Sequence, residues 1–191
     1  MKKKILVETS ARHIHLTKED VEKLFGKGAK LEVRAPLSQP GQFVSHQRVT
    51  LVGPKRSIER VSILGPERKE SQVEVSLTDA RTLGIAVPVR LSGDIVDTPG
   101  LKIVGPEGEI TLDKGLIAAK RHIHMTPSDA EEFGVKHGDV VKVRVGGHDR
   151  HLIFEDVVIR VNENFRLAMH VDTDESNAAG LEGEVYGEIV K

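Results

Sequence analysis

Two segments with paired histidines are the part of this sequence best suited to chemistry. Arg12-His13-Ile14-His15 returns far along the chain as Arg121-His122-Ile123-His124, and the two copies hold four of the nine histidines. On a β-strand, residues two apart point to the same face, so each pair presents two imidazoles together. On a helix the same spacing would turn them toward nearly opposite sides. Two imidazoles on one face suit a divalent metal ion such as zinc.

Two histidines do not complete such a site, because catalytic zinc takes three protein ligands and keeps one position open. The candidates for the missing ligands are Glu74, which alternates with Val73 and Val75, and His170. Each also has a simpler interpretation: Glu74 as a solvent-facing carboxylate, and His170 as a histidine beside a helix cap. A single His-x-His also fits a solvated strand, but two copies in matching contexts favour metal binding. The other histidines lie in polar, turn-like surroundings and are expected at the surface: His46, His137, His148 and His151.

The composition of the 191 residues excludes several other classes of function. No cysteine is present, so any metal must be bound by histidines and carboxylates, and no thiolate nucleophile exists. The net charge is −1, with five Phe, one Tyr and no Trp, which excludes the basic patches and stacking aromatics of nucleic-acid binding. No apolar run approaches the length of a membrane helix or a signal peptide, so we expect a cytoplasmic protein without membrane contact.

Short β-segments separated by turns must position these side chains. Helices are few: 18–25 after the cap Thr17, 78–83 before Gly84, and a segment capped by Thr126 that begins at Pro127 and ends at Gly134. With the internal repeat, this pattern predicts a mainly β fold of two related half-domains, joined near residues 116–120. Alternation and β-rich composition predict strands at residues 5–8, 30–34, 48–52, 58–64, 72–77, 87–91, 101–104, 140–145, 152–161, 166–170 and 184–189.

Motifs along nearly the whole chain resemble the phosphate propanoyltransferase family, the phosphotransacylases of propanediol-utilisation type. Besides the two Arg-His-x-His segments, the motifs are Gly41-Gln42-Phe43, Gly53-Pro54-Lys55, Leu64-Gly65-Pro66-x-Arg68, Gln72-Val73-Glu74-x-Ser76-x-Thr78-Asp79-Ala80, Ser92-Gly93-Asp94, Thr98-Pro99-Gly100 and Met169-His170-x-Asp172-Thr173-Asp174-Glu175. They occur in the family's order, and the paired histidine motifs are specific to it.

The resemblance implies an all-β fold of two β-barrels capped by short α-helices, with a two-metal site between them. The first barrel would comprise residues 12–116, and the second residues 1–11 together with 117–191. By the same resemblance, Arg68 would be the catalytic arginine that binds phosphate, and Gln42 and Asn177 would bind substrate, Asn177 by contacting coenzyme A. Two zinc ions would be held, one by His13, His15 and Glu74, the other by His122, His124 and His170.

The implied reaction interconverts acyl-CoA (acetyl- or propanoyl-CoA) plus phosphate with acyl phosphate plus coenzyme A. The residue types suit it, since zinc polarises a thioester carbonyl and accepts a thiolate, and an arginine binds phosphate through two parallel hydrogen bonds. Without a cysteine, and with no Ser–His–acid arrangement evident, direct attack by phosphate is favoured over an acyl-enzyme. Histidine and carboxylate ligands also accept Co²⁺, Ni²⁺ or Fe²⁺. The sequence is compatible with a homo-oligomer.

One departure and two alternatives accompany this hypothesis. Family members packaged in microcompartments have an N-terminal extension, whereas here only Lys2-Lys3-Lys4 precede the first strand, which argues against packaging. A cupin-like enzyme with one metal would use Glu19 as the third ligand, although Glu19 falls in the expected helix 18–25. A non-catalytic module would instead use the histidine pairs to bind structural zinc.

Overall fold

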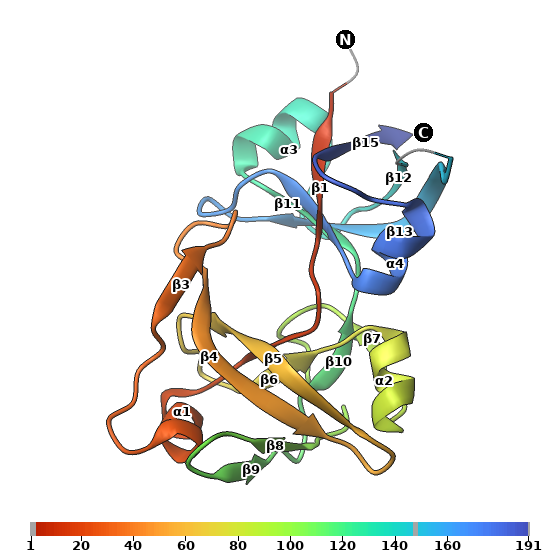
Figure 1. The fold of residues 1–191 in the computed structure, drawn as a ribbon. Helices are drawn as coiled ribbons and strands as arrows, with labels where there is room; N and C mark the ends of the chain where they lie inside the picture. Colours follow the sequence, from red (N-terminus) through yellow and green to blue (C-terminus); the bar gives the residue numbers. More distant parts are fainter. Residues whose placement is uncertain (1–2, 147–148, 191) are drawn as a thin grey trace. The chain divides into compact units, whose positions relative to one another are not determined.

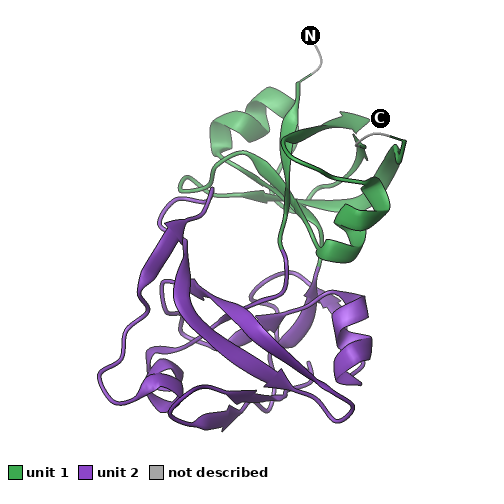
Figure 2. Cartoon of the chain, in the orientation of Figure 1, with its two compact units in different colours: residues 1–10, 120–191 green, residues 11–119 purple. Residues whose placement is uncertain are grey.

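The computed structural model describes residues 3–146 and 149–190, and the chain divides into two compact units. Unit 1 combines Met1–Ser10 with Lys120–Lys191, and unit 2 comprises Ala11–Ala119 (Figure 2). Each unit has its own hydrophobic core. Ile123, Val157 and Met169 are among the buried residues of unit 1, and Ile14, Leu51 and Ile63 among those of unit 2. The predicted mainly β class with short helices is confirmed.

Unit 1 is a closed six-stranded barrel (Figure 1). Two of its neighbouring pairs are parallel, β1 with β14 and β11 with β13, and the other pairs are antiparallel. Strand β12 alternates exposed and buried residues at its end, which is why its sequence pattern predicted it at the observed bounds. Around the barrel the strands are β1 (Ile5–Thr9), β14 (Ala168–Val171), β11 (His122–Met125), β13 (Leu152–Val161), β12 (Val140–Val145) and β15 (Val185–Val190).

Unit 2 contains a nine-stranded sheet whose strand order has two ends, so it is not a second closed barrel. The longest strands, β4 and β5, form an antiparallel pair with two register shifts. The central strands β2 and β6 have three residues each, and all of these are buried. In order the strands are β7 (Val89–Arg90), β10 (Leu116–Ala119), β6 (Gln72–Glu74), β2 (His13–His15), β5 (Ser57–Gly65), β4 (Phe43–Val52), β8 (Lys102–Val104) and β9 (Glu109–Thr111), with β3 (Val33–Pro36) paired to β4.

In the described residues, four short helices each follow a short strand and begin at a side-chain cap. They are α1 (Lys18–Phe25) after β2, α2 (Leu77–Leu83) after β6, α3 (Pro127–Phe133) after β11 and α4 (Thr173–Ala179) after β14. The caps Thr17, Ser76, Thr126 and Asp172 accept a hydrogen bond from the backbone N–H three residues later. None of the helices in the described ranges is long and apolar enough to cross a membrane.

The observed boundaries differ from the predictions where a cap interrupts a strand. The alternation over 72–77 predicts one strand, but the strand ends at Glu74 because Ser76 caps α2. Helix α4 was not predicted as a helix, and strands β9 and β10, with three and four residues, were missed. Helices α1 and α3 have the predicted bounds, because their caps and terminal glycines are explicit in the sequence.

Candidate metal centres and catalytic residues

Strands β2 and β6 bring three of the predicted ligands together in unit 2. The antiparallel register places His13 opposite Glu74, and His15 lies on the same face two residues along. Each of the three residues offers one ligand atom, and these atoms all lie within 4.8 Å of one another. His13 Nε2 is 3.5 Å from Glu74 Oε2. Glu74 is only 7% exposed, so its interpretation as a solvent-facing carboxylate is wrong.

The hydrogen bond that His13 makes leaves its other ring nitrogen, Nε2, available for a metal ion. His13 Nδ1 lies 2.8 Å from the carbonyl oxygen of Ala11, which can only accept, so Nδ1 is the donor. In the neutral imidazole, Nε2 then keeps its lone pair and faces Glu74. A metal-ligating histidine is commonly oriented in this way by a hydrogen bond from its other nitrogen.

His15 is the second imidazole of this cluster and is buried. Its Nδ1 has no hydrogen-bond partner among the described residues, which is costly for a buried polar atom unless a ligand satisfies it. Desolvation by burial, helped by the neighbouring His13 and Arg68, lowers the pKa of His15 to about 3. The ring is therefore neutral at physiological pH, which is the protonation state that a metal ion requires.

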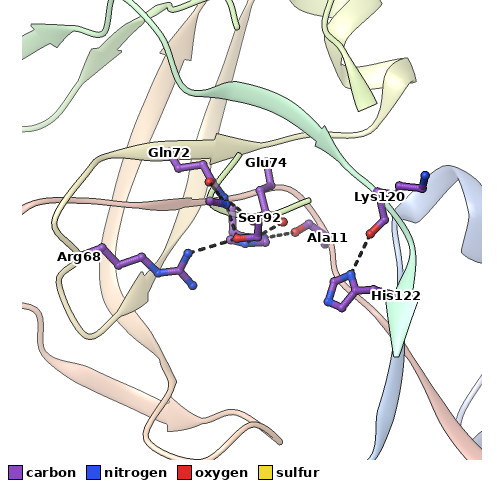
Figure 3. Close-up of polar contacts among 9 residues, drawn as sticks. Ala11, Arg68, Gln72, Glu74, Ser92, Lys120 and His122 are labelled. Atoms are coloured by element: carbon purple, nitrogen blue, oxygen red, sulfur yellow. Dashed lines mark hydrogen bonds and ion pairs between the residues drawn. The ribbon is translucent and has the colours of Figure 1, made fainter. Parts of the chain in front are cut away.

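A polar network fixes the carboxylate of Glu74 and reaches Arg68 (Figure 3). Gln72 Nε2 donates to Glu74 Oε1 at 2.6 Å and lies 2.9 Å from Ser92 Oγ. The carbonyl oxygen of the Gln72 side chain accepts from the N–H of Gly93 at 2.7 Å. Arg68 donates to Ser92 Oγ at 3.2 Å, and its backbone N–H donates to the carbonyl oxygen of Leu16. Sequence reasoning assigned no role to Gln72 or Ser92.

A second cluster, in unit 1, contains the other three predicted ligands. His122 and His124 lie on β11 and His170 on the neighbouring β14, with ring centroids 4.6 to 5.4 Å apart. His122 Nδ1 donates to the carbonyl oxygen of Lys120 at 2.8 Å, which repeats the arrangement of His13 (Figure 3). His124 Nδ1 has no hydrogen-bond partner in the described part of the chain. Desolvation, followed by the charges of His122, His170 and Arg160, lowers the pKa of His124 to about 2.

The two clusters are built by the same strand register. In unit 2 His13 pairs with Glu74 and His15 with Gln72, while in unit 1 His122 pairs with His170 and His124 with Ala168. Glu74 and His170 therefore occupy equivalent positions in their units. The donors in unit 2 fit zinc, because imidazoles, a buried ring nitrogen without a partner among the described residues and a carboxylate are typical of such sites, and this is the group of converging ligands in the described part of the chain.

The remaining candidates are more dispersed. Gln42 lies between β3 and β4, where its backbone bonds to Leu37 and Gln39, and Asn177 is exposed on α4. His46, His137 and His151 are exposed, as predicted, and His148 lies outside the described residues. Glu19 lies on α1, is 77% exposed and pairs with Lys23 at 2.7 Å. It lies outside the described cluster of converging ligands, which contradicts the cupin-like alternative.

The fold is mainly β, each of its two His-x-His strands is followed by a capped helix, and one His-x-His pair lies beside a buried carboxylate in a group that could hold a metal ion. Comparison with known proteins gives the family. The family model for phosphate propanoyltransferase matches residues 6–182. The chain belongs to this family and is an acyltransferase, as the resemblance in its motifs predicted.

The similarity to curated relatives extends over almost the whole chain. The phosphate propanoyltransferase of Thermotoga maritima is 58% identical over 177 residues, which are 93% of this chain and 84% of the relative. That of Clostridioides difficile is 52% identical over 187 residues, 98% of this chain and 89% of the relative. That of Salmonella typhimurium is 52% identical over 173 residues, 91% of this chain and 82% of the relative.

Proposed function

We propose that this protein interconverts acyl-CoA plus phosphate with acyl phosphate plus coenzyme A, using two zinc ions. One ion would be bound by His13, His15 and Glu74, and the other by His122, His124 and His170. The observation that most supports this proposal is the convergence of the first three ligands within 4.8 Å. Family membership supports the substrates, which would be a short acyl-CoA such as acetyl- or propanoyl-CoA, and phosphate.

In the proposed mechanism Arg68 binds and orients phosphate. A guanidinium presents paired N–H donors that match two phosphate oxygens, and Ser92 restricts the rotation of the side chain. An oxygen of this phosphate attacks the thioester carbon, so a C–O bond forms, the C–S bond breaks and coenzyme A leaves as a thiolate. When bound, zinc supplies Lewis-acid polarisation of the carbonyl and positive charge for the departing sulfur.

Glu74 and its neighbours determine the geometry of the first metal centre. Gln72 donates a hydrogen bond to one oxygen of the Glu74 carboxylate, Oε1, and the other oxygen, Oε2, faces His13 Nε2. The Gly93 N–H fixes Gln72 in turn, so the carboxylate is held in one orientation before an ion binds. Three protein ligands leave one position open, which is the arrangement of catalytic rather than structural zinc.

We further propose that Gln42 and Asn177 contribute to substrate binding, with Asn177 contacting coenzyme A. Asn177 is exposed and leaves its side chain accessible to a ligand. Co²⁺, Ni²⁺ or Fe²⁺ are expected to replace zinc, because the ligands are imidazoles and carboxylates without a thiolate.

The proposal is tested by measuring thiol release from acetyl-CoA and propanoyl-CoA by the zinc-loaded protein, with and without phosphate. The expected result is turnover that requires phosphate, stops after metal chelation and returns with zinc. Glu74→Gln should lose this activity together with one zinc ion per chain. A fully zinc-loaded protein without phosphate-dependent turnover would instead identify a structural zinc module.

A further inference from the structure

The arginine that precedes each histidine pair forms the same ion pair in both units. Arg12 Nη1 lies 3.1 Å from Asp79 Oδ1, and Arg121 Nη1 lies 2.8 Å from Glu175 Oε1. Each carboxylate residue comes five residues after the position that the strand register places opposite the first histidine of the pair. Each also accepts a hydrogen bond from the backbone N–H of the residue that caps its own helix, α2 or α4. Because the same contact recurs in both units, it belongs to the Arg-His-x-His motif rather than to a chance pairing of surface charges.

In unit 2 this ion pair joins the ends of the two strands that carry the candidate ligands. Strand β2 begins at His13 and strand β6 ends at Glu74, and these two residues lie opposite each other. Arg12 comes directly before β2, and Asp79 lies in the first turn of the helix that follows β6. Each strand has only three residues, so the ladder between them is short. The ion pair adds a side-chain link at the end of the ladder where His13 and Glu74 lie.

Arg12 also belongs to the peptide group that orients the ring of His13. The carbonyl oxygen of Ala11 accepts the hydrogen bond from His13 Nδ1 at 2.8 Å, and this carbonyl is part of the peptide bond between Ala11 and Arg12. A peptide group is planar, so fixing the backbone of Arg12 also fixes the direction of that carbonyl. The other ring nitrogen, Nε2, then faces Glu74 Oε2 at 3.5 Å. A chain of contacts thus runs from Asp79 through Arg12 and Ala11 to the ring of His13.

The carboxylate end of this chain of contacts is shielded from water. The side chain of Asp79 is 13% exposed, whereas that of Arg12 is 43% exposed. Asp79 Oδ2 accepts from the N–H of Ser76, the cap of α2, while Oδ1 accepts from Arg12. Two separate partners therefore hold the carboxylate in place as an anchor for the guanidinium. Arg121 also donates to the carbonyl oxygen of Glu155, so Arg12 is the simpler of the two arginines to test.

We propose that Arg12 is a positioning residue of the candidate metal centre in unit 2, an inference that rests on the proposed metal-dependent function. Its ion pair with Asp79 holds the peptide group between Ala11 and Arg12 in the direction that keeps Nε2 of His13 aimed at Glu74. A partly exposed ion pair contributes little energy of its own. Its role is to orient a ligand, as do other groups that support a metal-ligating histidine.

Electrostatics alone predicts an effect of the opposite sign, which separates the two explanations. Removing the positive charge of Arg12 would strengthen the binding of a nearby cation, because like charges repel. Loss of the ring's orientation weakens that binding instead. The expected loss is about three- to tenfold, smaller than the roughly 10- to 100-fold typical when a direct hydrogen-bond partner of a ligand is removed.

The test is zinc binding by the metal-free full chain, measured in competition with a chromophoric chelator. Arg12→Gln and Asp79→Asn should each bind one zinc ion about three- to tenfold more weakly than the wild type. The double variant should bind it no more weakly than either single variant, since both changes break the same contact. Lys102→Gln is the matched control, because it removes a positive charge and the ion pair with Glu109 in the same unit, and it should bind zinc as the wild type does.

A second measurement follows the ring of His13 directly. Nitrogen-15 spectra of the imidazole side chains, recorded without metal, should show His13 with its hydrogen on Nδ1 in the wild type. In Arg12→Gln the tautomer with hydrogen on Nε2 should also appear, because the carbonyl of Ala11 is no longer held in place. A role of Arg12 in stability alone would leave this tautomer unchanged.

Several results would overturn the inference. Unchanged or tighter zinc binding by Arg12→Gln would do so, as would losses that add up in the double variant. Weaker binding with an unchanged His13 tautomer would also overturn it, because the effect would not pass through the ring. A wild type that binds no zinc would contradict the proposed metal-dependent function itself. Circular dichroism reports the fold of each variant, and Asp79→Asn repeats the test from the other side of the contact.

Discussion

Replacing Gln72 by methionine tests whether the carboxylate of Glu74 is held ready for a metal ion. Methionine has a similar volume and is apolar, so Gln72→Met removes the 2.6 Å hydrogen bond to Glu74 Oε1 and the bond from Gly93 without opening a large cavity. A hydrogen bond to a charged group contributes about 1.5–3 kcal/mol. If this orientation is lost, zinc affinity at the cluster should fall about 10- to 100-fold, since about 1.4 kcal/mol corresponds to a factor of ten.

The assay is competition between the metal-free protein and a chromophoric zinc chelator. Gln47→Met is a matched control, because it likewise removes two hydrogen bonds of a glutamine side chain in unit 2, here with the backbone of Glu32 and Lys30, but Gln47 lies outside the cluster. The control should bind zinc as the wild type does. If Gln72→Met binds zinc within twofold of the wild type, Gln72 does not organise Glu74 for metal binding.

Three further predictions concern the two clusters and the arginine. First, the metal-free protein should lose stability as pH falls below about 6.5, because the unfolded chain protonates His15 whereas the folded chain, in which the pKa of His15 is about 3, does not. The free energy of unfolding, measured in urea at several pH values, should fall less steeply with falling pH in His15→Asn, by up to about 1.4 kcal/mol per pH unit. Equal slopes of the unfolding free energy against pH in the two proteins would refute this. Second, Arg68→Ala should retain its zinc but need at least tenfold more phosphate or lose turnover, as steady-state kinetics with elemental analysis would show; loss of zinc would make Arg68 structural. Third, His122→Ala should lose one zinc ion per chain and its activity, whereas His46→Ala, which changes an exposed histidine, should lose neither; an active His122→Ala enzyme would contradict the ligand assignment.

The elements with local signals could be predicted from the sequence. Helices α1 and α3 have explicit caps and terminal glycines, and β12 and β13 have long β-rich runs, so their observed bounds match the expected ones. Strands β9 and β10 are too short for a period to be visible. They form because neighbouring strands supply hydrogen bonds, which is a tertiary effect.

The histidine pairs were found because their spacing is local, but their supporting residues were not. Ser92 reaches the cluster of unit 2 only through the folding of a distant loop, so no spacing in the sequence indicates it. One signal was available and was overlooked. Four of the predicted ligands are each followed by one apolar residue and then a helix cap: His15-Leu16-Thr17, Glu74-Val75-Ser76, His124-Met125-Thr126 and His170-Val171-Asp172.

This fourfold pattern has a physical reason. The first residue lies at or near the end of a short strand, the apolar residue after it is buried, and the cap then begins a helix. Read as a repeat, it would have selected Glu74 and His170 over the other carboxylates and histidines without any family resemblance.

The most direct test of the account is a crystal structure of the purified protein with diffraction recorded on both sides of the zinc absorption edge. The proposed binding of two zinc ions predicts an anomalous peak in each unit, one within about 2.0–2.2 Å of ligand atoms of His13, His15 and Glu74, and one bound by His122, His124 and His170. An active crystal form with no zinc or other metal peak at His13, His15 and Glu74 would contradict it.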